Sequence, residues 1–178
     1  MAQILALVAA VALVGFIAYV ATRPDELRVV RDAVIAAPPE RIYAHLANLP
    51  GWRARSPWEK KYPAMKRTFE GPESGVGAAY AREGNKHVGS GRMQVTQAVP
   101  PSKVVIDLHF LKPFEARNTA EFTLAAEGAG TRVTWVMFGP ANFVSKLMGV
   151  FMDMDRMIGK DFEAGLANLK ALCEAPGA

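Results

Sequence analysis

The chain has 178 residues, a formal net charge of +4 and a hydrophobic fraction of 51%. Lysine and arginine alternate with aspartate and glutamate without forming a basic run, so the charge suits a protein beside anionic lipid and does not indicate nucleic-acid binding. The single cysteine, Cys173, excludes an internal disulfide. Because no Cys/His spacing indicates a metal site, we expect neither a metal nor a cofactor. No feature of the sequence specifies an oligomeric state.

Residues 1–22 predict a transmembrane anchor. They carry no charged side chain, and the apolar stretch Ile4 to Thr22 would span about 28 Å as a helix, close to the hydrocarbon thickness of a bilayer. Tyr19 lies near the far end, where interfacial aromatic residues are common. The alternative is a cleaved signal peptide, but no basic residue precedes the apolar stretch and Val20 falls where a cleavage site needs small residues.

Basic residues follow the anchor and do not precede it. Arg23, Arg28 and Arg31 therefore predict a cytoplasmic location for the rest of the chain under the positive-inside rule. Residues 23–27 form a short linker, residues 28–174 form one domain and residues 175–178 form a tail. Because the linker is so short, we expect the domain to lie close to the lipid headgroups.

The domain pattern predicts a strand, a helix, six further strands and a long helix. The first strand is expected over 27–37, followed by a helix that starts at Pro38-Pro39-Glu40, residue types favoured in a first helical turn. An aromatic-rich loop runs from 52 to 63. Turn residues separate six expected strands at 65–70, 76–82, 87–99, 103–111, 116–125 and 131–138. One helix is expected over 142–173, where apolar residues recur at spacings of three and four.

Alternation gives the expected sheet one apolar and one polar face. The apolar face carries Ala78, Tyr80, Met93, Val95, Ile106, Leu108, Phe110, Phe122, Leu124, Val133, Trp135 and Met137. The polar face carries Asp107, His109, Glu121, Thr123, Arg132 and Thr134. We expect the long helix to cover the apolar face.

Seven segments of the domain form a recognisable series: VIAAPPERIYAHLANLPGW at 34–52, SPWE at 56–59, GVGAAYAREGN at 75–85, GSGRM at 89–93, KPFEARNTAEFTL at 112–124, GTRVTWVMFG at 130–139 and FMDMDRMIGKDFEAGLANLK at 151–170. Taken in this order, they resemble the START-like, or SRPBCC, superfamily, in particular its polyketide cyclase/dehydrase and lipid transport members. The resemblance implies an α+β helix-grip fold, a seven-stranded antiparallel sheet wrapped around a long C-terminal helix with a cavity between them, here preceded by one transmembrane helix. Because the superfamily hosts many functions, the resemblance does not specify a ligand.

Such a cavity would bind a small hydrophobic ligand through an apolar wall with a few polar groups. The candidate ligand-binding residues are Trp52 and Trp58 near the mouth, Tyr80, Arg82, Met93, Phe110, Asn118, Phe122 and Trp135 from the sheet, and Met148, Phe151 and Met152 from the long helix. The alternative for each of these side chains is that it packs against the others in a filled core.

Arg82 is the most informative polar position. Directed inward, it could bind a carboxylate, phosphate or carbonyl group of a ligand, although we favour a strand that ends near Ala81 and lets Arg82 reach solvent. Glu59 and Asn118 are possible polar anchors and more readily serve as hydrogen-bonding residues in loops and caps. Asp155 either pairs with an arginine of the sheet or points outward.

No catalytic residue is assigned. His109 and Asp107 share a strand face, but that face is the polar one, so we interpret them as surface residues. No Ser, Cys or His/carboxylate triad is visible in the sequence. The favoured function is a membrane-anchored module that binds a lipid, isoprenoid, quinone or polyketide-like molecule. The alternatives are a polyketide cyclase/aromatase-like enzyme, in which Arg82 or Glu59 orients the substrate, and a structural or partner-binding domain with a filled cavity.

Overall fold

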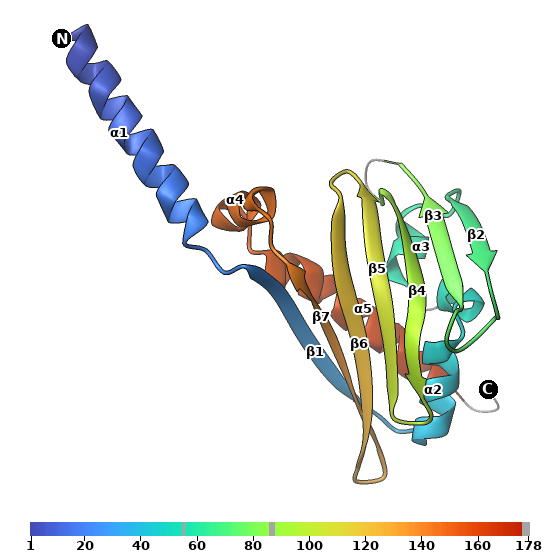
Figure 1. The fold of residues 1–178 in the computed structure, drawn as a ribbon. Helices are drawn as coiled ribbons and strands as arrows, with labels where there is room; N and C mark the ends of the chain where they lie inside the picture. Colours follow the sequence, from blue (N-terminus) through green and yellow to red (C-terminus); the bar gives the residue numbers. More distant parts are fainter. Residues whose placement is uncertain (55, 86–87, 176–178) are drawn as a thin grey trace.

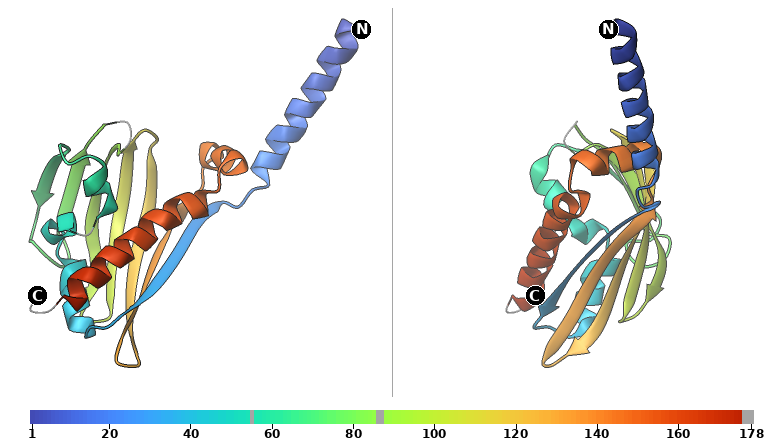
Figure 2. Two further views of the ribbon diagram at one scale, coloured as in Figure 1. Left: turned by 180° about the vertical axis from the view of Figure 1, so that it is seen from behind. Right: turned by 90° about the vertical axis from the view of Figure 1, so that its left-hand side faces the viewer.

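The computed structural model describes residues 1–54, 56–85 and 88–175. Helix α1 (Ala2–Ala21) projects away from the remainder of the chain, in which helices cover one face of a curved sheet (Figures 1 and 2). Helix α1 is long and apolar enough to cross a membrane, and Val20 is its one buried residue. The guanidinium of Arg23 lies 5.8 Å from the ring centroid of Tyr19, at the point where the helix gives way to the linker.

The sheet contains seven antiparallel strands, in the spatial order β1-β7-β6-β5-β4-β3-β2. They are β1 (Glu26–Ile35), β2 (Lys66–Glu70), β3 (Ala79–Glu83), β4 (Ser90–Val99), β5 (Lys103–Lys112), β6 (Ala116–Glu127) and β7 (Gly130–Pro140). The expected seven-stranded antiparallel sheet is confirmed. The third strand starts at residue 79, later than expected, because Gly75 and Gly77 adopt positive φ angles of 79° and 90° that an extended strand does not allow. His87, the expected start of the next strand region, lies outside the described residues.

Between β1 and β2 lie three short helices, α2 (Pro39–Ala47), the 3-10 helix η1 (Pro50–Ala54) and α3 (Pro57–Lys61). The aromatic-rich segment expected as a loop is therefore partly helical, and proline opens each helix, as its fixed φ favours. Trp52 does not lie near a cavity mouth, contrary to the expectation. It is buried in η1, and its indole nitrogen donates to the carbonyl of Leu46 at 3.0 Å, so it belongs to the core.

The C-terminal region is two helices, which corrects the single helix expected over 142–173. Helix α4 (Phe143–Phe151) ends at Met152, and α5 (Met154–Glu174) starts after Asp153. Met152 and Asp153 both adopt extended backbone angles, and the Asp153 side chain accepts a hydrogen bond from the backbone N–H of Arg156. Aspartate is a strong N-cap because it satisfies an otherwise unpaired N–H of the first turn, so Asp153 starts a new helix where the apolar periodicity alone runs on.

Helix α5 crosses the inward face of the sheet (Figure 2). The expected apolar face is confirmed, because its members are buried or partly buried against one core. On β1, Arg31 also faces α5, and its guanidinium donates to both carboxylate oxygens of Asp155 at 2.9 and 3.1 Å and to Glu163 at 2.8 Å. Gly159 leaves room for that guanidinium on the helix surface. The pairing of Asp155 with a sheet arginine, one of two expected alternatives, is thus confirmed.

Candidate functional site

The inward face of the sheet differs between its two ends. We call the end where β1 begins and β5 finishes the α1 end, because α1 leaves the molecule there, and the opposite end the far end (Figure 1). Along β5, Val104 and Ile106 at the far end are fully buried, whereas Leu108 and Phe110 toward the α1 end are only partly buried. Strand β4 repeats this gradient from Val95 to Met93. Along these two strands the face is sealed at the far end and partly open toward the α1 end.

Stacked aromatic rings fill the middle of the face. The ring of Trp135 on β7 lies parallel to that of Phe162 on α5, with centroids 3.8 Å apart. Phe122 lies 4.8 Å from Trp135 and meets Trp52 edge-on at 6.0 Å. Next to Trp135, Gly165 of α5 has no side chain, and a Cβ there would lie 2.9 Å from the indole. Two expected cavity-wall residues, Phe122 and Trp135, therefore pack against each other and against Trp52 and α5, as a filled core requires.

Beyond this stack lies a group of partly buried residues that we call the open section. Its members are Trp58, Arg82, Met93, Leu108, Phe110 and Ile158. Trp58, on α3, meets Trp135 edge-on at 6.5 Å and so links the open section to the stack. Four of the twelve expected site residues, Trp58, Arg82, Met93 and Phe110, thus remain accessible on the inward side of the sheet.

Arg82 does not lie beyond the end of its strand, which corrects our preferred expectation. Strand β3 continues to Glu83, and alternation keeps Arg82 on the same face as Tyr80. Its guanidinium lies 5.6 Å from the ring centroid of Trp58, within reach of a cation–π interaction. The cation is thereby held over an aromatic surface at the open section, where it could meet a carboxylate, phosphate or carbonyl oxygen.

Tyr80 is engaged elsewhere. It is buried in the corner between β2 and β3, where its ring stacks on Phe69 at 5.1 Å and its hydroxyl contacts the sulfur of Met65 at 3.8 Å. Asn118 is buried inside β6 with its amide against Gly139 of β7, so the expected role in a loop or cap is wrong. Gly139 has no side chain that would collide with that amide.

One buried donor on the inward face is unsatisfied. The indole nitrogen of Trp135 is fully enclosed and has no acceptor among the described residues. An indole N–H left without an acceptor in an apolar environment costs free energy, so a ligand oxygen that reached it would be bound favourably. Alternation placed Trp135 on the apolar face without any sign of this, because the absence of an acceptor depends on all the elements that surround the ring.

The three expected site residues beyond β7 do not line the inward face, because they belong to α4 and the break that follows it. Phe151 is 73% exposed, and its ring lies 6.1 Å from that of Phe16 in α1. Phe151 and Met152 instead border a hollow of about 610 Å³ between the linker, the start of β1, α4 and the start of α5. Met148 lies on α4 beside α1 and not on α5. The sequence pattern did not indicate this hollow, since the break before Asp153 creates it.

A second hollow, of about 420 Å³, lies at the α1 end of the outer face, beside Asp107, Arg117 and Phe138. On the same face His109 contacts Glu115 at 3.0 Å, in agreement with the expected surface role.

Among residues 1–54, 56–85 and 88–175, no group of three or more His, Cys, Asp or Glu side chains could hold a metal ion. The Glu59 side chain lies outside the described part of the structure.

Solved structures share this architecture at low sequence identity. Aha1 from Colwellia psychrerythraea is similar over 85% of this chain and 99% of its own, with 17% identity and a TM-score of 0.60. The major latex-like protein 151 of Panax ginseng matches 85% of this chain and all of its own, with 9% identity and a TM-score of 0.58. The di-domain ARO/CYC protein BexL of the BE-7585A pathway matches 89% of this chain and 53% of its own, with 14% identity and a TM-score of 0.59. At these identities the likeness shows the fold alone.

A search of curated protein sequences gave no match. A family model, in contrast, matches residues 26–174, which extend from the first residue of β1 to the last residue of α5. The match therefore covers the whole sheet and the helix that crosses it, in a chain whose solved neighbours share the START-like, or SRPBCC, helix-grip fold. The chain belongs to the polyketide cyclase/dehydrase and lipid transport family.

Proposed function

We propose that the protein is a membrane-anchored domain that binds a small hydrophobic ligand over the open section of its inward face. In this proposal residues 1–22 are the transmembrane anchor, residues 23–27 the linker and residues 28–174 the ligand-binding domain, on the cytoplasmic side. The observation that carries it is the burial gradient along β4 and β5, which leaves Met93, Leu108 and Phe110 incompletely covered by α5. Apolar side chains left in this state on a concave fold favour binding of an apolar molecule.

Two polar groups fit a ligand with one oxygen-bearing end. The Arg82 guanidinium, held over Trp58, favours a carboxylate or another anionic oxygen. The unsatisfied indole N–H of Trp135 lies next to Trp58 and favours any oxygen acceptor. An elongated apolar molecule with a single polar head would match this arrangement, as a fatty acid or an isoprenoid acid does. The family description, which includes lipid transport, supports the same class.

The position of the open section along the strands supports access from lipid. The open section lies toward the end of the sheet from which α1 leaves, and the aromatic stack closes the path toward the far end. A ligand that partitions into the bilayer would therefore meet the accessible part of the face first. We propose that the tether restricts the domain to ligands of the adjacent membrane.

The test uses the full chain in phosphatidylcholine vesicles with a photoactivatable fatty acid, followed by mass spectrometry of the crosslinked peptides. We expect crosslinks on β4 and β5 that the Leu108→Arg variant loses, because a charge in the open section opposes an apolar ligand. Val105→Arg is the matched control, since Val105 lies on the same strand but on the outer face. Crosslinks confined to α1 and α4, or equal loss in both variants, would contradict ligand binding at this site.

A further inference from the structure

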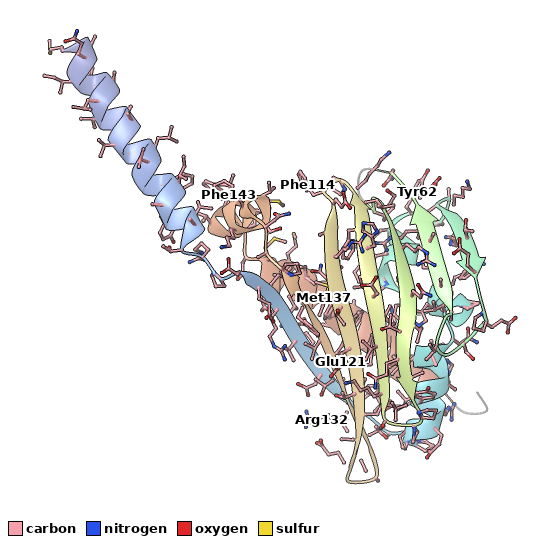
Figure 3. The ribbon with its side chains drawn as sticks, in the orientation of Figure 1. Tyr62, Phe114, Glu121, Arg132, Met137 and Phe143 are labelled. Atoms are coloured by element: carbon pink, nitrogen blue, oxygen red, sulfur yellow. The ribbon has the colours of Figure 1, made fainter. Side chains whose placement is uncertain are left out.

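Helix α4 is apolar but has no buried residue. Its sequence, FVSKLMGVF, contains one charged residue, and the side chains of Phe143 and Val144 are 48% and 45% exposed. Figure 3 shows Phe143 on this helix at the end of the molecule from which α1 leaves, opposite Arg132. Helix α4 packs against α1 but leaves Phe143, Val144 and Phe151 exposed, and exposed apolar side chains grouped on one helix are typical of a surface that meets another apolar phase.

The one charged side chain of α4, Lys146, points toward the end of α1 and the linker. The ammonium of Lys146 donates to the carbonyl of Ala21, the last residue of α1, at 3.3 Å and also pairs with Asp25. Its side chain is nearly buried by these contacts. The surface that α4 turns away from the protein therefore carries no charge from the helix itself.

The contacts with α1 set the level of α4 relative to a bilayer. The Phe151 ring packs against Phe16, which lies about 7.5 Å along the helix axis before Ala21. Amphipathic helices at a membrane surface bury their apolar face by about 5–10 Å into the headgroup and acyl boundary. If α1 spans the bilayer, α4 is thus held at the depth of that boundary.

The surroundings of α4 suit anionic headgroups. The hollow of about 610 Å³ separates α4 from the start of β1, so the sheet does not cover the side of α4 that borders the hollow. Arg23 and Arg28 border this hollow together with Glu26, Asp153 and Asp155. Asp155 is paired with Arg31 and Asp153 caps α5, whereas among the described residues neither Arg23 nor Arg28 has a carboxylate partner. Unpaired arginines beside an apolar helix favour a surface of anionic lipid.

We propose that α4 is an interfacial membrane helix, with Phe143 and Val144 among the acyl chains and Arg23 and Arg28 at the headgroups. The inference rests on the membrane anchoring of α1 in the proposed function and adds a second membrane contact to it. We assign the bilayer and not a second copy of the chain, because α4 is continuous with α1 through Phe16 and Phe151. Two contacts, one spanning and one interfacial, fix the orientation of the domain and hold its open section toward the bilayer.

The test places a nitroxide spin label on single cysteines of the full chain, reconstituted in vesicles of phosphatidylcholine and phosphatidylglycerol. Native Cys173 is buried and stays unlabelled. The variants are Phe143→Cys and Val144→Cys on α4, Val8→Cys on α1, and Val99→Cys, a matched control that is 42% exposed at the far end. Collisions of each label with oxygen, which concentrates in lipid, are compared with collisions with a water-soluble nickel chelate.

We expect the α4 labels to resemble the Val8 label, with high oxygen and low nickel accessibility, and the Val99 label to show the reverse. If the α4 labels are open to nickel while the Val8 label is not, the interfacial helix is overturned and the anchor stands. If the Val8 label is also open to nickel, the anchoring in the proposed function fails and the inference fails with it. Labels on α4 that are shielded from both agents and broadened by spin–spin coupling would identify a second copy of the chain as the partner and overturn the bilayer assignment.

Discussion

At the far end of the inward face, Val104, Ile106 and Phe122 are fully buried, and the aromatic stack closes against α5. Toward the α1 end, Met93 on β4 and Phe110 on β5 are only partly covered, and α4 lies beside α1. In the proposed function, packing for stability and binding of the ligand thus belong to different parts of the same sheet face. Residues at the far end gain from close packing, whereas a binding surface requires apolar side chains that the fold leaves unpaired.

The C-terminal apolar segment breaks near the α1 end, between α4 and α5. Had the helix continued without interruption from 142, its first turns would have remained in line with α5. Asp153 instead caps a new helix, and α4 lies beside α1. The two C-terminal helices differ in the same sense as the two ends of the sheet: α5 packs on β1 and has buried residues, whereas α4 packs on α1 and has none.

The largest expected effect comes from two phenylalanines of the same sheet face. Phe122→Ala should lower the free energy of unfolding by about 3–5 kcal/mol, because it leaves a cavity beneath α5. Phe110→Ala should cost only about 1 kcal/mol, because the side chain is partly exposed in the open section. Urea unfolding in detergent micelles, followed by near-ultraviolet circular dichroism, measures both. Equal losses would show that the two ends are packed alike.

Two helical glycines make a second, smaller contrast. A Cβ at Gly165 would lie 2.9 Å from the Trp135 ring, so Gly165→Ala should destabilise the domain by about 1–3 kcal/mol through overpacking. In α4, a Cβ at Gly149 would meet no neighbouring atom within 4 Å, so Gly149→Ala should stabilise the chain by about 0.5–1 kcal/mol through helix propensity. Thermal unfolding of the two variants measures both signs. A destabilised Gly149→Ala would indicate that another element packs closely on α4.

Much of the fold was accessible from the sequence because it depends on local patterns. Alternation of apolar residues identified the strands and the inward face, since burial of one sheet face imposes a period of two. The C-terminal break was not predicted, because the apolar residues Phe151, Met154 and Ile158 keep helical spacing across it. The available signal was Asp153, an N-cap residue type with helical sequence after it, and it would have separated α4 from α5.

The site was less accessible because openness is not a local property. Phe122 and Phe110 have the same residue type and lie on the same sheet face, yet one is enclosed and the other is partly exposed. Which of them α5 covers depends on the angle at which that helix crosses the sheet. The unsatisfied indole of Trp135 and the position of Arg82 over Trp58 likewise depend on η1, α3 and α5 together.

The smallest expected effect concerns pH and the point where α5 begins. The Arg31 guanidinium holds the pKa of Asp155 below its ordinary value of about 3.8 by donating hydrogen bonds to the carboxylate. A lowered folded-state pKa means that the pair stabilises the fold above the ordinary pKa and loses this contribution as the pH falls through the folded-state value. Asp155→Asn should therefore be less stable than the wild type at neutral pH, and the difference should shrink below pH 3.8.

Thermal unfolding from neutral to acidic pH measures this difference, with Asp107→Asn on the outer face as the control for loss of a surface charge. The effect is expected to be small because Asp155 is largely exposed, and exposed ion pairs contribute little. The Asp155 variant is informative because Arg31 binds the first turn of α5, next to the break that separates α5 from α4. If Asp155→Asn also changes the accessibility of a label on α4, the ion pair holds the boundary between the two helices. If it does not, α4 is positioned by α1 alone, and the contact between Phe16 and Phe151 is sufficient to separate the two ends.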